Sequence, residues 1–279
     1  MSALQLSAPA KINLSLRVLG KREDGFHEID TTMVKLPGLA DRLEFSESGG
    51  FSFTYSDPDL PAGEDNLVVK AVRAYEAASG IPCRYSIHLT KRVPHGAGLA
   101  GGSSDAASTL LGLEQLHEGK LGSAKLAEIA ASLGSDISFF LTPGAGRCTG
   151  RGEHIEKVPS PSPLNVLLLK PWFGVSTPDA YGRWNGSVEL PGVLYGGQEI
   201  GGVTLVNDLE RPVFGKHRFL AELKMWLLAR DEVGAALLCG SGSTMFSVLH
   251  DGADAEALAK SARHELDPGF WHWAGVTEG

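Results

Sequence analysis

Cysteine is scarce in this 279-residue chain: Cys83, Cys148 and Cys239 lie far apart in sequence and form no C-x-x-C pair. This spacing indicates small buried side chains in a reducing compartment, without a reactive role. No apolar run approaches the 18 residues of a membrane-spanning helix, and the first residues lack the apolar segment of a secretory signal. We therefore expect a cytoplasmic protein.

Long blocks of like charge are also missing. The formal net charge is −8, with both signs interspersed along the chain. Such a distribution offers no electrostatic footprint for nucleic acid or for a membrane surface. A phosphorylated small molecule is still compatible with it, because helix termini and a few lysines can hold phosphate locally.

A chain of this length can bury one large core or two smaller ones, and two is the expectation. Pro159, Pro161 and Pro163 form the best candidate boundary. Helical and strand patterns alternate without a regular βα repeat, so both halves are predicted to be α+β sandwiches. Apolar periodicity predicts strands at residues 10–20, 31–36, 42–46, 51–55, 85–89, 165–170, 235–238, 245–249 and 271–276. Helices are predicted after a cap at Asp65 or Asn66 and ending at Gly80, then at 103–117, 123–133 (capped by Ser123, closed by Gly134), 205–214, 219–230 and 253–264, with a loop at 185–202.

The most informative stretch runs from Pro94 to Ser108. Its glycines, Gly96, Gly98, Gly101 and Gly102, remove side chains from a loop that feeds directly into a predicted helix. Such a loop lets a ligand approach the backbone, and the helix start offers unpaired N–H groups and the positive end of a dipole. The pattern predicts a nucleotide-phosphate site.

Other interpretations of this loop differ in class. The glycines satisfy G-x-G-x-x-G, but a dinucleotide fold also needs a second strand ending in an acidic residue, and residues 114–133 are polar and then helical. A P-loop would need a following Gly-Lys-Ser/Thr, which is missing. A plain flexible turn remains an open alternative for the loop taken alone.

Three further segments are candidate functional sites, and each also has a purely structural interpretation. Lys11 and Asn13 share one face of a predicted strand, where a lysine is often only solvated. Asp136 lies between a helix end and the apolar run 137–140; it could be a cap, or a buried carboxylate that needs a partner such as a lysine. The segment 240–244, Gly-Ser-Gly-Ser-Thr, could be a simple hairpin turn.

The order of these segments resembles the GHMP small-molecule kinases, which carry three motifs in sequence. Residues 8–14 match the first motif, 94–106 the second and 239–244 the third, and the similarity extends from about residue 7 to 250. Further matching segments are 21–29, 65–67, 133–137 and 207–210. The resemblance implies an α+β, two-domain GHMP kinase fold. Residues 1–158 would form a domain like the second domain of ribosomal protein S5 and carry the ATP loop, and 159–279 would form a ferredoxin-like domain.

The resemblance also implies roles for individual residues. Lys11 and Asp136 would be the catalytic pair, with Asp136 taking or orienting the proton of the acceptor hydroxyl and Lys11 facing the transferred phosphate. ATP would be bound by Asn66, Pro94, His95, Gly96, Ala97, Gly98, Leu99, Ala100, Gly101, Gly102, Ser103 and Ser104. The acceptor would be bound by Asn13, Phe26, His27, Pro178, Tyr181, Gly240, Ser241, Gly242 and Ser243, with Phe26 and Tyr181 stacking on a cytosine. Mg²⁺ is expected with ATP; its ligands are not assigned, since the candidate Ser104 is equally explained as a helix cap.

The implied reaction is ATP-dependent phosphorylation of the 2-hydroxyl of 4-diphosphocytidyl-2-C-methyl-D-erythritol, in the non-mevalonate isoprenoid pathway. The expected partner is therefore a small molecule with a cytidine diphosphate moiety, bound by a monomer or homodimer. A related kinase acting on mevalonate, homoserine or a sugar, or a catalytically silent nucleotide-binding module, are the alternatives. Two departures from the family pattern bear on affinity: Ala100 interrupts the glycine run, and Phe26 replaces a tyrosine.

Overall fold

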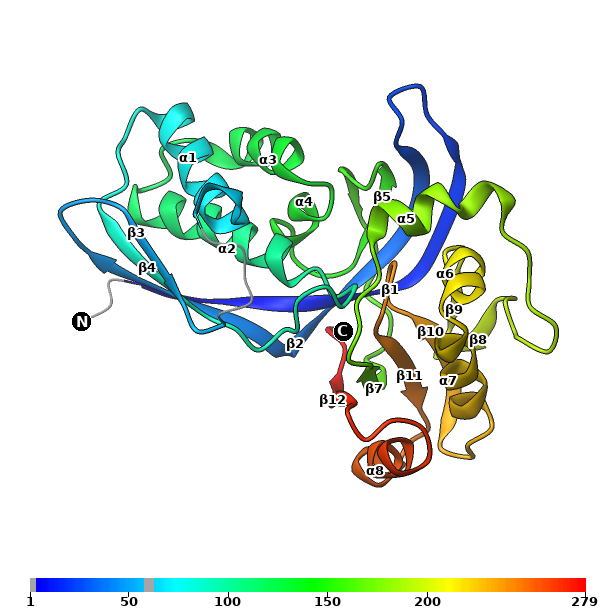
Figure 1. Ribbon diagram of the computed structural model, residues 1–279. Coiled ribbons are helices and arrows are strands. Elements are labelled where there is room, and N and C mark those ends of the chain that lie inside the picture. Colours follow the sequence, from blue (N-terminus) through cyan, green and yellow to red (C-terminus); the bar gives the residue numbers. More distant parts are fainter. Residues whose placement is uncertain (1–3, 58–62) are drawn as a thin grey trace.

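The computed structural model describes residues 4–57 and 63–279, which form two β-sheets with helices packed against them. The larger sheet has the strand order β3-β4-β2-β1-β9-β8, and β5 joins it by pairing with β2 and β6. Its strands are β1 (Leu4–Lys21), β2 (His27–Glu47), β3 (Ser52–Tyr55), β4 (Tyr85–Thr90), β5 (Gly146–Gly150), β6 (His154–Lys157), β8 (Gln198–Ile200) and β9 (Val203–Asn207). Four helices gather over one face of this sheet (Figure 1): α1 (Leu67–Ser79), α2 (Gly101–Leu116), α3 (Gly122–Leu133) and α4 (Ile137–Phe140).

The smaller sheet is antiparallel and has the order β10-β11-β7-β12. Its strands are β7 (Asn165–Lys170), β10 (Val233–Leu238), β11 (Met245–Leu249) and β12 (Trp271–Val276). The helices of this half are α5 (Thr177–Gly182), α6 (Glu210–Lys216), α7 (Arg218–Leu228) and α8 (Ala255–Glu265), and two 3₁₀ turns occur at Gly63–Asp65 and Trp184–Gly186. Counted from β7, the βαββαβ order with the first strand between the third and fourth is the ferredoxin-like arrangement that was expected.

Buried apolar side chains form several separate cores. Phe45, Tyr75 and Leu110 belong to the core between the large sheet and its helices. Ile12 and Phe246 belong to a second core that joins the two sheets. Because this junction is packed with fully buried side chains, motifs carried by different halves of the chain are held in a fixed relation.

The first two strands are longer than the sequence pattern predicted. Strand β2 runs unbroken through the segment 37–39, where Pro-Gly indicated an end. The pairing shifts at this place, since Ala10 faces Leu36 and Pro9 faces Ala40. The extra residues are therefore absorbed as a bulge, which bends the strand without terminating it.

The prediction of a helix at 205–214 was wrong in its first part. Residues 203–207 form β9, whose Val206 and Asn207 pair in parallel with Ser15 and Leu16 of β1. The helix begins only at Glu210, after the side-chain oxygen of Asn207 accepts the N–H of Leu209. The predicted loop at 185–202 likewise contains β8, which pairs with β9. Strand β9 is stabilised by a partner strand 191 positions away in sequence, which a local pattern cannot reveal.

Helix boundaries show which caps were identified correctly. The side chain of Asn66 accepts the N–H of Val68, and Gly80 ends α1 in the left-handed conformation, so both predicted caps are confirmed. The predicted cap Ser123 is wrong, because α3 starts at Gly122 and its first N–H groups are bound by the carboxylate of Glu114. Helix α2 starts at Gly101, two residues before the predicted start.

All three cysteines are free and buried, as the sequence indicated. Burial raises the pKa of each thiol, that of Cys148 to about 12, so none forms a thiolate near neutral pH. Within residues 4–57 and 63–279, no helix combines the length and apolar character needed to cross a bilayer. The boundary after residue 158 stays a proposal, and the parallel pairing of β9 with β1 crosses it.

Candidate active site

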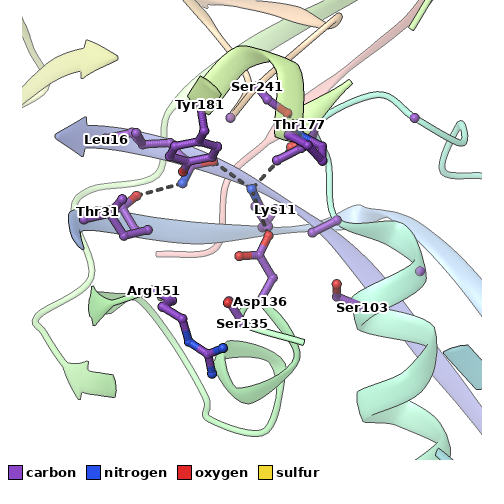
Figure 2. Close-up of a pocket in the computed structure, with 18 of the residues that line it drawn as sticks. Lys11, Leu16, Thr31, Ser103, Ser135, Asp136, Arg151, Thr177, Tyr181 and Ser241 are labelled. Atoms are coloured by element: carbon purple, nitrogen blue, oxygen red, sulfur yellow. Dashed lines mark hydrogen bonds and ion pairs between the residues drawn. The ribbon is translucent and has the colours of Figure 1, made fainter. Parts of the chain in front are cut away.

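A cavity of about 670 Å³ lies where the two halves of the chain meet, which is large enough for a nucleotide and part of a second substrate. Its walls come from β1 and β2, the glycine loop, the start of α2, the segment before α4, α5 and the turn after β10. Charged and aromatic side chains among the lining residues include Lys11, Phe26, His27, Asp136, Arg151 and Tyr181. Figure 2 shows Lys11 reaching from its strand toward Asp136 within this cavity.

Lys11 and Asp136 meet although 125 positions separate them in the sequence. The Lys11 Nζ lies 3.4 Å from Asp136 Oδ2. Lys11 is 4% exposed, whereas about a third of the Asp136 side chain remains accessible from the cavity. The carboxylate makes no capping hydrogen bond to α4, which removes the cap alternative. A buried ammonium beside an accessible carboxylate can hold a phosphate and a hydroxyl next to one another.

The ammonium of Lys11 is fixed by two further contacts. Its Nζ donates to Asn13 Oδ1 at 2.8 Å and to the Gly98 carbonyl at 3.3 Å, so its three hydrogen-bonding directions are all used. Asn13 in turn donates through Nδ2 to Thr31 Oγ1, which donates to the Ser15 carbonyl. This chain of hydrogen bonds orients the amide of Asn13, so that its oxygen faces the lysine.

The glycine loop contacts the third motif backbone to backbone. Gly98 has a φ of +78°, and a Cβ built on it would lie 2.0 Å from the Cys239 carbonyl oxygen. The N–H of Thr244 donates to the Ala97 carbonyl at 3.3 Å. Glycine is required at position 98 because any side chain would push the two loops apart. The third motif therefore supports the glycine loop.

The loop ends at the start of α2, which faces the cavity. Gly101, Gly102 and Ser103 all line it, so the unpaired N–H groups of a 16-residue helix lie beside the ligand space. Ala100, the residue just before the helix, has φ +55° and ψ +29°, which is the left-handed region. An alanine in this region is strained, which the sequence alone left open because a residue with negative φ would have carried no such cost.

A buried ionic cluster anchors the beginning of the loop. Lys91 donates to the carboxylates of Asp41 and Asp105, and all three side chains are almost fully buried. Asp41 Oδ1 also accepts the N–H groups of Arg92 and Val93. Burial raises the pKa of Asp105, and for Lys91 the two carboxylates outweigh the lowering effect of burial on its pKa. Both carboxylate oxygens of Asp41 are thus used: Oδ1 holds the backbone that leads into the loop, and Oδ2 accepts from Lys91.

The aromatic residues expected around a base lie at the other end of the cavity. His27 and Tyr181 have ring centroids 5.3 Å apart, and Phe26 is about half exposed. Burial and the charge of Lys21 lower the pKa of His27, so its imidazole is neutral at pH 7 and can both donate and accept. Burial, together with the charge of Asp136, raises the pKa of Tyr181, which keeps its phenol protonated.

The third motif is held by a residue that has no access to the cavity. Asn207 donates through Nδ2 to the carbonyls of Leu238 and Gly240, at 2.8 and 2.7 Å. Ser241 Oγ lies 2.7 Å from Thr177 Oγ1, which joins this turn to α5. The turn therefore has anchors on both sides, and its Gly240 comes within reach of the Lys11 ammonium.

Most residues singled out in the sequence line the cavity, and a few do not. Asn66, Leu99, Ser104, Gly242 and Ser243 are absent from its walls. Asn66 caps α1 next to the lining residue Leu67, Leu99 accepts the N–H of Lys11, and Ser104 is buried with no partner for its hydroxyl among the described residues. Gly242 and Ser243 belong to the turn but not to the cavity walls, and Ser243 Oγ donates to the Phe173 carbonyl.

Sequence reasoning missed several lining residues, listed by position as Lys21, Thr31, Lys91, Ser135, Arg151 and Thr177. Alternation along β2 could have placed Thr31 on a common face, since it lies two residues from Met33, the residue opposite Asn13. Nothing local marks Arg151, which follows a short strand that was itself not predicted.

In the part of the chain that the structure describes, no three histidine, cysteine or acidic side chains cluster as a metal site. Asp136 is the one carboxylate among the described lining residues. An all-protein metal cage is therefore not built here, and a cation that enters with phosphates is the arrangement that this donor set fits.

Comparison with known proteins agrees with this geometry. Residues 66–144 match the family described as GHMP kinases N terminal domain, which defines the class of protein. A 4-diphosphocytidyl-2-C-methyl-D-erythritol kinase of Methylacidiphilum infernorum is 39% identical and covers 95% of this chain and 93% of its own. The crystal structure of a 4-(cytidine 5'-diphospho)-2C-methyl-D-erythritol kinase superimposes with a TM-score of 0.79 at 32% identity, covering 99% of this chain and 100% of the other.

A homoserine kinase from Cytophaga hutchinsonii has a TM-score of 0.68 at 17% identity, over 99% of this chain and 94% of the other, and shows the shared fold alone. The chain belongs to the 4-diphosphocytidyl-2-C-methyl-D-erythritol kinase family of the GHMP kinases.

Proposed function

We infer that this chain transfers the γ-phosphoryl group of ATP to the 2-hydroxyl of 4-diphosphocytidyl-2-C-methyl-D-erythritol, a step of the non-mevalonate isoprenoid pathway. The observation that carries the inference is the 3.4 Å contact between Lys11 and Asp136, in a cavity that the glycine loop and the aromatic residues share. One end of that cavity suits phosphates and the other suits a base.

Asp136 would accept the hydrogen bond of the acceptor hydroxyl and direct its oxygen in line with the γ-phosphorus. The new oxygen–phosphorus bond forms as the bond to the leaving ADP breaks, and the hydroxyl proton passes to the carboxylate. A free aspartate is a weak base at neutral pH. The loose transition state of phosphoryl transfer asks little of a base until late, so orientation of the hydroxyl is the larger contribution.

Electrostatic stabilisation would come from Lys11 and from the start of α2. Lys11 is held by Asn13 and Gly98, so its charge is preorganised before ATP binds. The N–H groups at the start of α2 add further donors, and donors fixed in a dry site stabilise developing charge without reorganisation. This combination explains why the loop, the helix and the lysine converge on one place.

We propose Mg²⁺ as the companion of ATP, where it would neutralise phosphate charge. Mg²⁺ commonly takes one or two protein ligands and completes its shell with phosphates and water. The Ser103 hydroxyl, at the start of α2, lines the cavity and could serve as an Mg²⁺ ligand. The hydroxyl of Ser104 is buried and does not line the cavity.

For the acceptor, Phe26 and Tyr181 are the proposed stacking partners of the cytosine, and the neutral imidazole of His27 would read its polar edge. Stacking of a base on an aromatic ring contributes about 1–3 kcal/mol by analogy with single-strand binders. Asn13 would contact the erythritol end, because it lies beside the reacting pair.

A panel of acceptors tests the function. Purified protein with ATP and Mg²⁺ is expected to phosphorylate 4-diphosphocytidyl-2-C-methyl-D-erythritol far faster than mevalonate, homoserine or a hexose. Turnover of one of the latter alone would reassign the chain to a sister kinase, and ATP binding without any turnover would favour the silent module. The cytoplasmic location and the monomeric or homodimeric state stay predictions, for cell fractionation and light scattering to test.

A further inference from the structure

Arg151 is a cation of the cavity to which the reaction described above gives no role. It follows the last residue of β5 and lies in the turn that leads to β6. This turn packs beneath the reacting pair: a Cβ built on Gly152 would lie 3.4 Å from Ser135 Cβ and 4.0 Å from Asp136 Oδ1. Figure 2 shows Arg151 and Ser135 on the same side of Lys11 as Asp136.

The same side chain also reaches the base end of the cavity. The guanidinium carbon of Arg151 lies 4.9 Å from the ring centroid of Phe26, within the range of a cation–π contact. Arg151 therefore links the two ends, since the next residue, Gly152, lies beside Ser135 and Asp136 while the guanidinium lies over Phe26.

The charges around the cavity leave Lys21 and Arg151 for an anionic ligand, and of these two it is Arg151 that contacts the Phe26 ring. The cations among its described walls are Lys11, Lys21, Lys91 and Arg151. Asp136 faces Lys11, and Asp41 and Asp105 neutralise Lys91. Arg151 is paired with Glu153, whose Oε1 lies 3.4 Å from Nε while its Oε2 accepts the Arg151 backbone N–H, and the charge of Arg151 helps to lower the pKa of Asp24. No described residue is recorded as accepting from the terminal NH₂ groups of Arg151.

We propose that Arg151 binds the diphosphate of the acceptor substrate, with Phe26 holding the guanidinium in place. The proposal rests on the proposed function. A ligand with its base against Phe26 and its hydroxyl at Asp136 must place the linking diphosphate between them, which is where Arg151 lies. A planar guanidinium presents paired donors that match phosphate oxygens, and its stacking on a ring leaves their edge free.

The alternative is that Arg151 only supports the Phe26 ring. The two possibilities differ in their dependence on phosphate. Support of the ring affects cytidine and cytidine diphosphate alike, whereas phosphate binding affects the diphosphate alone.

The test is calorimetric titration with cytidine and with cytidine diphosphate, with the ATP site filled by a non-hydrolysable ATP analogue. Arg151→Gln is expected to weaken cytidine diphosphate about tenfold, the range for loss of a charged hydrogen bond. Cytidine affinity should stay within about twofold, and Arg151→Lys should fall between because it keeps the charge but loses the paired donors. Arg84→Gln, an exposed residue outside the cavity, is the control for net charge.

Equal losses for both ligands, or no loss for either, would overturn the assignment. Arg151→Lys keeps the test valid if the glutamine variant folds poorly. Wild-type protein that binds no cytidine diphosphate would overturn the proposed function together with this inference, whereas wild-type binding that Arg151→Gln leaves intact would overturn the inference alone.

Discussion

Ala100 offers a direct test of how the phosphate loop is strained. It is one of two non-glycine residues with positive φ among those described, at +55°, and it lies between the glycine loop and the first turn of α2. An L-residue in this region costs about 1–2 kcal/mol. Replacement by glycine removes that cost but adds about 0.4–1 kcal/mol of unfolded-state entropy. Ala100→Gly should therefore stabilise the protein by about 0.5–1 kcal/mol.

A gain of this size raises the melting temperature by about 2 °C for a chain of this length, which differential scanning fluorimetry or calorimetry resolves. Two variants serve as controls. Glu118 has φ +56° but lies in the turn after α2, so Glu118→Gly should give a similar gain with no effect on ATP binding. Ala97 is buried and has no positive φ, so Ala97→Gly should destabilise by about 1 kcal/mol.

A fall in melting temperature for Ala100→Gly as large as that of Ala97→Gly would refute the reasoning. In that case the methyl group of Ala100, which packs against the core below α2, contributes more than the backbone strain costs.

Three other expectations follow from the site. Asp136→Asn should lower kcat by about 10²–10⁴-fold with ATP affinity retained, and near-normal turnover would remove this carboxylate from the mechanism. Gly98→Ala should destabilise by about 2 kcal/mol or more and weaken ATP binding, because its Cβ meets the backbone of the third motif; an unchanged melting curve would contradict the close approach. Burial and Lys21 lower the pKa of His27, so its NMR titration should have a midpoint below the ordinary value and move upward in Lys21→Gln; an unmoved midpoint would mean that burial alone lowers this pKa.

Local chemistry predicted those parts of the fold that local contacts determine. Asn66 and Gly80 bound α1 because a side-chain cap and a left-handed glycine act within four residues of the helix end. Strand β7 was predicted with its observed bounds, because it is a continuous apolar run buried on both faces. Lys11 and Asn13 share a face because alternation along a strand fixes it.

Features that depend on distant partners could not be predicted in this way. Strand β2 continues through Pro37 because β1 pairs with it on both sides of the bulge. Strand β9 exists because β1 offers it an edge, and the α3 cap is Glu114 from the preceding helix. Arg151 enters the cavity only because β5 pairs with β2 and so turns its end toward Asp136.

The third motif shows how such distant contacts produce function. In the sequence this segment could be a simple hairpin turn, but Asn207 and Thr177 hold it by hydrogen bonds and it packs against Gly98. The Gly98 carbonyl is also an acceptor for the Lys11 ammonium, so a shift of the turn would move the lysine's own hydrogen-bond partner. We therefore expect the third motif to act on the transferred phosphate through the backbone of the loop, with its glycines allowing the close approach.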